Sequence, residues 1–372
     1  MLNRSGTWVA PGRVNLIGEH TDYNGGFCLP IALEHTTRAR VRLRSDDEVR
    51  FRSTAGDRGG EYAVGVLAAF RAESYDVPGA DISVDSDVPI GAGLSSSAAL
   101  ECAIALAIND LVGLGLPRTV LARIAQRAEN EFVGAPTGIL DQSASLLCTA
   151  GHALLLDCRD QSTEQVPFDP AASGLHLLVI DTRAHHQLTD GQYGDRRDEC
   201  ARAARALGLG SLRDAGAADL DLLGDDLLRR RARHVITENQ RVLEVVVMLR
   251  AGRLGDIGPL LTASHASLRD DYEVSCPELD VAVAAALAAG ARGARMTGGG
   301  FGGSAIALAD SSAAVEEEVR AAFDRHGFAA PDVFEVRPGA GARREPGSTT
   351  LDERSGRTTA RPTTGPPSTK GH

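Results

Sequence analysis

An unusual concentration of polar and charged side chains lies in residues 12–26, GRVNLIGEHTDYNGG. Two carboxylates and an imidazole, Glu19, His20 and Asp22, fall within four residues of one another. Together they offer several hydrogen-bond acceptors and one group that can donate or accept, which suits a ligand with many hydroxyls. The segment Thr-Asp-Tyr-Asn-Gly-Gly is also typical of a solvated turn. By itself the run leaves a sugar site and a polar turn open.

A second candidate site lies in residues 88–101, VPIGAGLSSSAALE, where Gly91, Gly93 and three serines precede a helical pattern. Glycines let the backbone approach a ligand closely, and a helix N-terminus offers unpaired N–H groups with a positive partial charge. The segment has no GxxxxGK[ST] pattern and no basic residue, so it is not a Walker A loop. A lone serine here would indicate a helix cap, whereas three serines behind GxG favour a phosphate site.

Two acidic residues follow in residues 128–142, AENEFVGAPTGILDQ. Glu129 ends a predicted helix and could hold a magnesium ion that bridges nucleotide phosphates, while Asp141 could face a substrate hydroxyl. A glutamate at a helix end is normally solvated. Asp141 lies in an apolar context, where a carboxylate without a partner is costly, so we expect a cation beside it and favour Arg13. A third glycine-rich segment, MTGGGFGGSAIAL at residues 296–308, favours tight packing when taken alone.

Composition limits the class of protein. A chain of 372 residues with 43% hydrophobic and 24% charged residues is long enough for two domains. Its 39 Lys and Arg against 50 Asp and Glu give a net charge of -11, which opposes nucleic-acid or anionic-membrane partners. Its six cysteines are scattered, which favours neither a zinc site nor a disulfide scaffold. The sequence shows no apolar signal core and no membrane-spanning run, so we expect a cytoplasmic location.

The predicted elements are mixed strands and helices. Val14, Leu16 and Ile17 suggest a short buried strand that ends at Gly18, and residues 36–51 alternate as strands whose wet face carries arginines. The further predictions are helices at 95–114 and 117–132, strands at 153–157 and 175–181, a helical region at 193–255, a helix at 279–289, a strand at 304–309, a helix at 313–326 and a strand at 332–336.

This order lacks strict βαβ repetition, so an α+β fold with two lobes is favoured. We place the division near Ser173, which separates residues 1–172 from residues 173–338. Residues 339–372 are rich in Gly, Pro, Ser, Thr and Arg, and we expect a disordered tail there.

The three motifs, in this order, resemble the GHMP kinase superfamily, and residues 12–26 closely resemble the galactokinase signature within it. Residues 264–280, SHASLRDDYEVSCPELD, are also similar to galactokinases, and the resemblance covers roughly residues 7–339. It implies a two-lobed GHMP kinase fold, with an N-terminal lobe similar to the ribosomal protein S5 domain 2-like fold and an α+β C-terminal lobe. It also implies ATP-dependent phosphorylation of galactose at the anomeric hydroxyl, and we expect a monomer.

The resemblance implies a role for each matching position. Asp141 would accept the proton of the anomeric hydroxyl, and Arg13 would stabilise the transition state. A loose transition state needs little deprotonation beforehand, so Asp141 would chiefly position and stabilise. Ser97 and Glu129 would hold Mg²⁺. The sugar site would be lined by Glu19, His20, Thr21, Asp22, Gly138 and Tyr193. The ATP phosphates would be wrapped by Gly91, Ala92, Gly93, Leu94, Ser95, Ser96 and Ser97.

The chain departs from the family pattern between Ser53 and Tyr62, where it has only the linker TAGDRGGE. Galactokinases usually carry a longer segment there, near the nucleotide base, so the adenine contacts do not carry over from the family. Two alternatives stay open. One is a related sugar 1-kinase acting on N-acetylgalactosamine or a uronic sugar, and the other is a non-catalytic sensor that binds galactose and ATP.

Overall fold

The computed structural model describes residues 4–54, 59–135, 137–184 and 189–346. Its strands are β1 (Ser5–Asn15), β2 (Phe27–Cys28), β3 (Pro30–Leu43), β4 (Val49–Ser53), β5 (Ala80–Ser86), β6 (His152–Asp157), β7 (Ser162–Pro167), β8 (His176–Asp181), β9 (Gly293–Thr297), β10 (Ser304–Ala309), β11 (Asp332–Val336) and β12 (Arg343–Arg344). Its α-helices are α1 (Gly60–Ala72), α2 (Ser96–Val112), α3 (Arg118–Arg127), α4 (Leu140–Leu147), α5 (Thr189–Ala206), α6 (Asp226–Arg250), α7 (Gly258–Asp270), α8 (Pro277–Ala288) and α9 (Ser312–His326). A π-helical turn, η2 (Ala128–Val133), continues α3.

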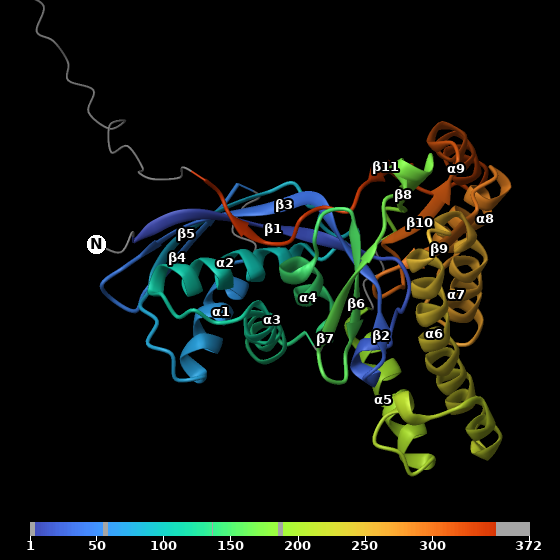
Figure 1. The fold of residues 1–372 in the computed structure, drawn as a ribbon, viewed down its shortest axis with the longest axis horizontal. Coiled ribbons are helices and arrows are strands. Elements are labelled where there is room, and N and C mark those ends of the chain that lie inside the picture. Colours follow the sequence, from blue (N-terminus) through green and yellow to red (C-terminus); the bar gives the residue numbers. More distant parts are fainter. Residues whose placement is uncertain (1–3, 55–58, 136, 185–188, 347–372) are drawn as a thin grey trace, which may run out of the picture.

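Three sheets organise these elements (Figure 1). The first has the order β12-β1-β3-β5-β4, the second β11-β8-β10-β9 and the third β2-β6-β7. Helices α1 to α4 lie with the first sheet, α7 to α9 lie with the second, and the third sheet lies between them (Figure 1). The α+β organisation predicted from the sequence is confirmed. The division near Ser173, which falls just before β8 begins the second sheet, stays a proposal.

Strand β1 is longer than predicted. The sequence suggested a short strand at Val14, Leu16 and Ile17, but β1 begins at Ser5 and ends at Asn15. Within this strand, the pairing of β1 with β3 shifts register between Pro11 and Arg13. A bulge of this kind tolerates a residue without an N–H and a residue without a side chain. Arg13 therefore follows an irregularity inside a continuous strand.

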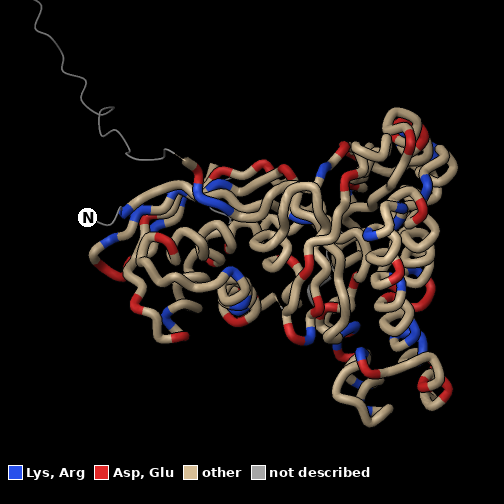
Figure 2. Tube along the Cα trace, in the orientation of Figure 1, with Lys and Arg blue, Asp and Glu red and all other residues tan. Residues whose placement is uncertain are grey.

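The arginine-rich face of β3 is a paired protein surface. The Arg42 guanidinium lies 2.8 Å from the Asp81 carboxylate, and the Arg38 guanidinium lies 2.6 Å from Glu345. Figure 2 shows basic and acidic residues interspersed over the molecule rather than gathered on one element. The predicted wet face that carries arginines is confirmed, and carboxylates from distant parts of the chain offset its charge.

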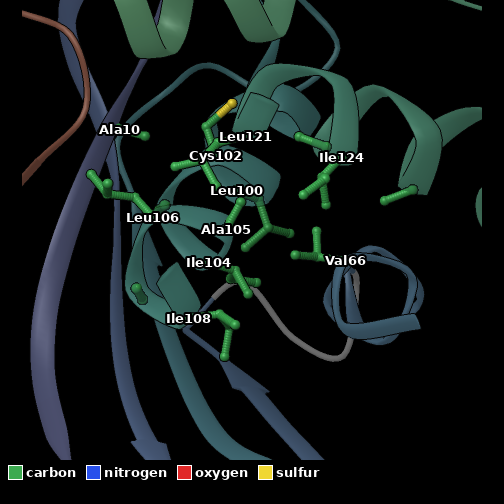
Figure 3. Packing of buried hydrophobic residues seen from close by; sticks show 14 of the residues in the cluster. Ala10, Val66, Leu100, Cys102, Ile104, Ala105, Leu106, Ile108, Leu121 and Ile124 are labelled. Atoms are coloured by element: carbon green, nitrogen blue, oxygen red, sulfur yellow. The ribbon is translucent and has the colours of Figure 1, made fainter. Parts of the chain in front are cut away.

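Helix α2 is central to the first hydrophobic core. The helix contributes Ile104, Ala105 and Ile108 to this core, where they lie with Val66 of α1 and Ile124 of α3 (Figure 3). All five side chains are inaccessible to solvent. The helix also packs against β1 and β3. Because α2 is held on every side, its N-terminus and the glycine-serine loop before it have a fixed position relative to β1.

The prediction of a disordered tail is wrong for residues 339–346. Ala342 is fully buried, β12 pairs with β1, and Glu345 contacts Arg38. This segment was expected to have too little to bury, but small residues fit closely here: an added Cβ at Gly339 would lie 2.4 Å from the Leu33 carbonyl oxygen. The rest of the predicted tail lies outside the described residues. Across the described ranges, no helix combines the length and the apolar character needed to cross a bilayer.

Candidate active site

The first motif, the acidic segment and the third glycine-rich segment meet at one cavity of about 230 Å³. Five of the six residues predicted to read a sugar contribute to its wall. The lining residues are Arg13, Glu19, His20, Asp22, Thr137, Gly138, Leu140, Asp141, Tyr193, Gly298 and Gly299.

Thr21 is the exception among the predicted sugar contacts. Its side chain is fully buried, and its hydroxyl lies 2.8 Å from the Gly18 carbonyl oxygen and 2.7 Å from that of Phe27. It therefore closes the turn from within instead of lining the cavity. A hydroxyl between two backbone carbonyls gives no signal in the sequence, which is why this residue was placed wrongly.

Arg13 and Asp141 form the expected ion pair. Arg13 Nε and Nη2 donate to the two Asp141 carboxylate oxygens at 2.8 Å each, a bidentate arrangement. Arg13 Nη1 donates to the Gly93 carbonyl oxygen at 2.7 Å, and the Ser95 hydroxyl donates to Asp141. The cavity and the glycine-serine loop are thus joined at one carboxylate.

The serine loop does not act as an ordinary helix cap. Ser95 stands at the N-cap of α2 with φ 60°, a left-handed conformation that is uncommon for a residue with a side chain, and it makes no cap hydrogen bond. Its hydroxyl contacts Asp141 instead. The first N–H groups of α2 therefore have no side-chain cap at Ser95. Strained backbone of the kind seen at Ser95 is concentrated at functional sites.

Glu129 lies beside Ser97, its partner in the metal pair that the family resemblance implies. The Ser97 hydroxyl donates to Glu129 Oε1 at 2.9 Å, and Thr137 and Gln142 donate to Oε2 at 2.8 and 2.7 Å. Glu129 belongs to the π-helical turn that continues α3, which the sequence did not indicate. Burial and the nearby charge of Asp141 raise the pKa of the Glu129 carboxyl.

Burial also displaces the pKa values of two cavity residues. It raises the pKa of Asp22 to about 7, and the negative charge of Asp141 adds to this effect. It lowers the pKa of His20 to about 3, so this imidazole is neutral at pH 7. His20 Nε2 faces the Gly299 carbonyl oxygen at 3.2 Å, and a carbonyl can only accept, so Nε2 carries the hydrogen. Nδ1 then accepts from the Tyr23 hydroxyl at 2.8 Å.

The third glycine-rich segment contributes to the site, although packing was the expectation from its sequence alone. The Gly298 N–H and the Thr297 hydroxyl donate to Glu19 Oε1 at 2.7 and 3.1 Å, and Asn15 Nδ2 donates to Oε2 at 2.9 Å. Glu19 therefore joins the first and third motifs, and much of its accepting capacity is already used by the protein.

Two groups of residues around the site were missed. The Tyr23 hydroxyl lies 2.8 Å from that of Tyr272, whose ring is 4.9 Å from the ring of His20. Tyr272 lies in residues 264–280, which the family resemblance had marked without a role. Polar residues of α6 also reach the first motif, and no pattern in the sequence indicated them.

Family models match three parts of the chain. They are described as the galactokinase galactose-binding signature, at residues 3–43, the GHMP kinases N terminal domain, at residues 61–149, and the GHMP kinases C terminal, at residues 245–327.

Whole-chain relatives agree with these matches. A galactokinase of Streptomyces coelicolor is 53% identical over 363 residues, covering 91% of this chain and 94% of the relative. A galactokinase of Mycobacterium bovis is 47% identical over 356 residues, covering 90% of this chain and 98% of the relative.

Solved structures show the same fold. The galactokinase of Lactococcus lactis, complexed with galactose, aligns with a TM-score of 0.86 at 34% identity, covering 92% of this chain and 96% of that chain. A mevalonate kinase of L. major, in complex with R-mevalonate, aligns with a TM-score of 0.64 at 18% identity over 91% of this chain and 98% of that chain, a likeness of fold alone.

Proposed function

Because this chain belongs to the galactokinase family of the GHMP kinases, we propose that it transfers the γ-phosphoryl group of ATP to the anomeric hydroxyl of galactose. The products are galactose 1-phosphate and ADP. One observation carries the proposal: the Asp141 carboxylate borders the cavity and also accepts from Ser95 of the glycine-serine loop. A hydroxyl bound in the cavity would therefore meet a phosphoryl group bound by the loop at Asp141.

Asp141 and Arg13 would divide the chemistry between them. Asp141 orients the attacking hydroxyl and takes its proton as the O–P bond forms and the bond to the ADP oxygen breaks. Arg13 holds Asp141 in place with two hydrogen bonds and offsets negative charge that develops on the transferred group. Its third contact, to the Gly93 carbonyl, keeps the guanidinium at the loop that would carry the phosphates.

The nucleotide would extend from this loop into a second cavity of about 450 Å³. Ser96 and Ser97 border that cavity, and its other walls include apolar side chains such as Phe51, Ile90 and Leu100. A purine has two apolar faces, which suits such walls. Ser53, Gly59, Glu61 and Tyr62 also line it, so residues within the short linker and on either side of it supply part of the proposed adenine site.

Ser97 and Glu129 fit a magnesium ion. Mg²⁺ prefers hard oxygen ligands and usually binds through one or two carboxylates, several waters and substrate phosphates, which matches one carboxylate and one hydroxyl. Within the described ranges, no group of three or more His, Cys, Asp or Glu residues is placed so that it could hold a metal ion. When bound, the ion supplies charge neutralisation at the phosphates. Thr137 and Gln142 would hold the Glu129 carboxylate in orientation.

We further propose that the enzyme is a cytoplasmic monomer that acts on galactose and ATP without nucleic-acid or membrane partners. The net charge of -11 supports the last part, because it disfavours polyanionic partners.

The function is tested by measuring ATP consumption with galactose, N-acetylgalactosamine and a uronic sugar. We expect turnover that depends on galactose and on Mg²⁺. Preferred turnover of either other sugar would reassign the substrate, and galactose binding without any turnover would indicate a sensor.

Substituting Gly138 should disturb galactose recognition through Asp22. A Cβ at Gly138 would lie 1.7 Å from Asp22 Oδ2, so Gly138→Ala forces this carboxylate out of its position. We expect kcat/KM for galactose to fall by about 10²-fold, as for other small displacements of a positioned group. Steady-state kinetics check this, with Gly224→Ala as the control, because a Cβ at Gly224 meets nothing within 4 Å. Equal losses in both variants would contradict the assignment of Gly138 to the sugar site.

Galactose affinity should increase as the pH rises through 7. The pKa of Asp22 is raised to about 7, so at lower pH its carboxyl is neutral and accepts hydrogen bonds from sugar hydroxyls more weakly. His20, with a pKa of about 3, does not titrate in this range. Calorimetry without ATP, from about pH 6 to about pH 8, should show Kd falling by up to about tenfold per pH unit on the acid side.

Asp22→Asn should bind galactose weakly and without this pH dependence. In the wild-type protein, the pH dependence of folding stability has the opposite sign to that of galactose affinity. Because the folded pKa lies above the ordinary value of 3.8, the free energy of unfolding falls as the pH rises from 3.8 to about 7. A wild-type Kd that is constant over this range would contradict the assigned role of Asp22.

A further inference from the structure

Helix α6 places three buried polar side chains against the backbone of residues 18–27, which carry His20 and Asp22 and are called the sugar-reading loop below. His234 Nε2 lies 3.1 Å from the Glu19 carbonyl oxygen. Glu238 Oε1 accepts from the Gly18 N–H at 2.9 Å, and Asn239 Oδ1 accepts from the Phe27 N–H at 2.8 Å. These three bonds lie on either side of His20 and Asp22 in the sequence, so α6 holds both ends of the sugar-reading loop.

All three groups lie on the buried side of α6. Positions 234 and 238 are four residues apart, a spacing that puts their side chains on the same face of a helix, and position 239 is the next one round the helix from 238. His234 and Glu238 are 0% exposed and Asn239 is 8% exposed. Buried polar groups of this kind are costly unless each finds a partner, and here the partners are backbone groups of the loop.

The protonation states fit these contacts. A carbonyl only accepts, so His234 Nε2 carries the hydrogen, and Nδ1 accepts from the Ser267 hydroxyl at 3.0 Å. Burial lowers the pKa of His234 to about 4, which keeps the ring neutral. Burial acts to raise the pKa of Glu238, but Arg241, His234 and Arg295 together lower it to about 2. Glu238 also accepts from Ser264 and Arg241 at 2.6 and 2.7 Å.

The loop is too close to α6 for any side chain to separate them. Gly18 has φ 95°, and an added Cβ there would lie 2.5 Å from the Phe27 carbonyl oxygen and 2.9 Å from Val242 of α6. At Gly26 an added Cβ would lie 2.4 Å from Asn239 Oδ1. The contact is therefore between loop backbone and α6 side chains.

We propose that His234, Glu238 and Asn239 are positioning residues, through which α6 holds the sugar-reading loop in its binding conformation. The proposal rests on the proposed function, because it concerns the galactose site. The three residues do not line the cavity, and they contact the loop at the backbone of Gly18, Glu19 and Phe27. Their loss should weaken galactose use while ATP use is maintained.

The test compares two buried asparagines that make the same kind of bond. Asn239 accepts from the Phe27 N–H at 2.8 Å, and Asn109 of α2 accepts from the Leu116 N–H at 2.9 Å, away from the cavity. We expect Asn239→Leu to raise the galactose KM by about tenfold, the effect of one lost hydrogen bond, with the ATP KM within about twofold. Asn109→Leu should lower thermal stability and leave both KM values unchanged. Asn239→Asp, which keeps the Oδ1 acceptor, should restore the galactose KM.

Hydrogen exchange supplies a readout independent of turnover. Amides of residues 18–27 should exchange faster in Asn239→Leu and in His234→Leu than in wild type or in Asn109→Leu. If Asn239→Leu does not fold, His234→Leu carries the comparison. Unchanged galactose KM, or equal rises in the galactose and ATP KM values, would overturn the proposal. Absence of galactose-dependent turnover in the wild-type enzyme would instead overturn the proposed function, and the exchange data would still report on the loop.

Discussion

Asp141→Asn is expected to lower kcat with galactose by about 10²–10⁴-fold, the range typical of a lost general base. Asparagine keeps one oxygen that can accept from Arg13 but cannot take the proton of the sugar hydroxyl. Because Asp141 is only one of several polar residues around the cavity, galactose should still bind. Single-turnover kinetics measure the chemical step, and calorimetry measures galactose binding.

A matched control for this variant is Asp81→Asn. Asp81 is also paired with arginine at 2.8 Å, and its side chain is 27% exposed against 24% for Asp141. It lies on β5, outside the cavity, so this change should alter stability without lowering kcat. An Asp141→Asn enzyme with a kcat near the wild-type value would rule out the assigned role.

Arg13→Lys is expected to lower kcat by about 10²–10³-fold, comparable to the removal of one preorganised donor from a transition state. Lysine keeps the positive charge but has no planar fork, so it cannot hold both Asp141 oxygens and the Gly93 carbonyl together. Asp141 would lose its fixed orientation and the developing charge would be offset less well. Rapid-quench measurement of phosphoryl transfer checks the result.

Arg44→Lys serves as the control for this second variant. Arg44 also makes a two-pronged contact with a carboxylate, Asp46, and its side chain is 15% exposed against 8% for Arg13. Because it lies beyond β3 at the outer end of the first sheet, we expect kcat to be unchanged. Similar losses in both variants would show that arginine pairing contributes to general stability and not to the chemistry.

The local patterns of the chain determined the mixed α+β class, the arginine-bearing wet face of β3 and most helices. They also indicated which polar residues were too concentrated or too buried to be ordinary surface. The need of Asp141 for a cation followed from the cost of burying a carboxylate, and Arg13 meets it. Inferences of this kind need only neighbouring residues and the chemistry of one side chain.

Only the tertiary structure decided where distant groups meet. Thr21 belongs to the same run as Asp22, yet it is turned onto backbone carbonyls while Asp22 borders the cavity. Gly298 reaches Glu19 from more than half the chain away, and Asn239 holds Phe27 from the far side of the loop. Such contacts depend on how sheets and helices pack, which no local pattern encodes. The run at residues 12–26 could therefore be recognised as chemically unusual from its sequence, but its division into cavity wall and structural turn required the fold around it.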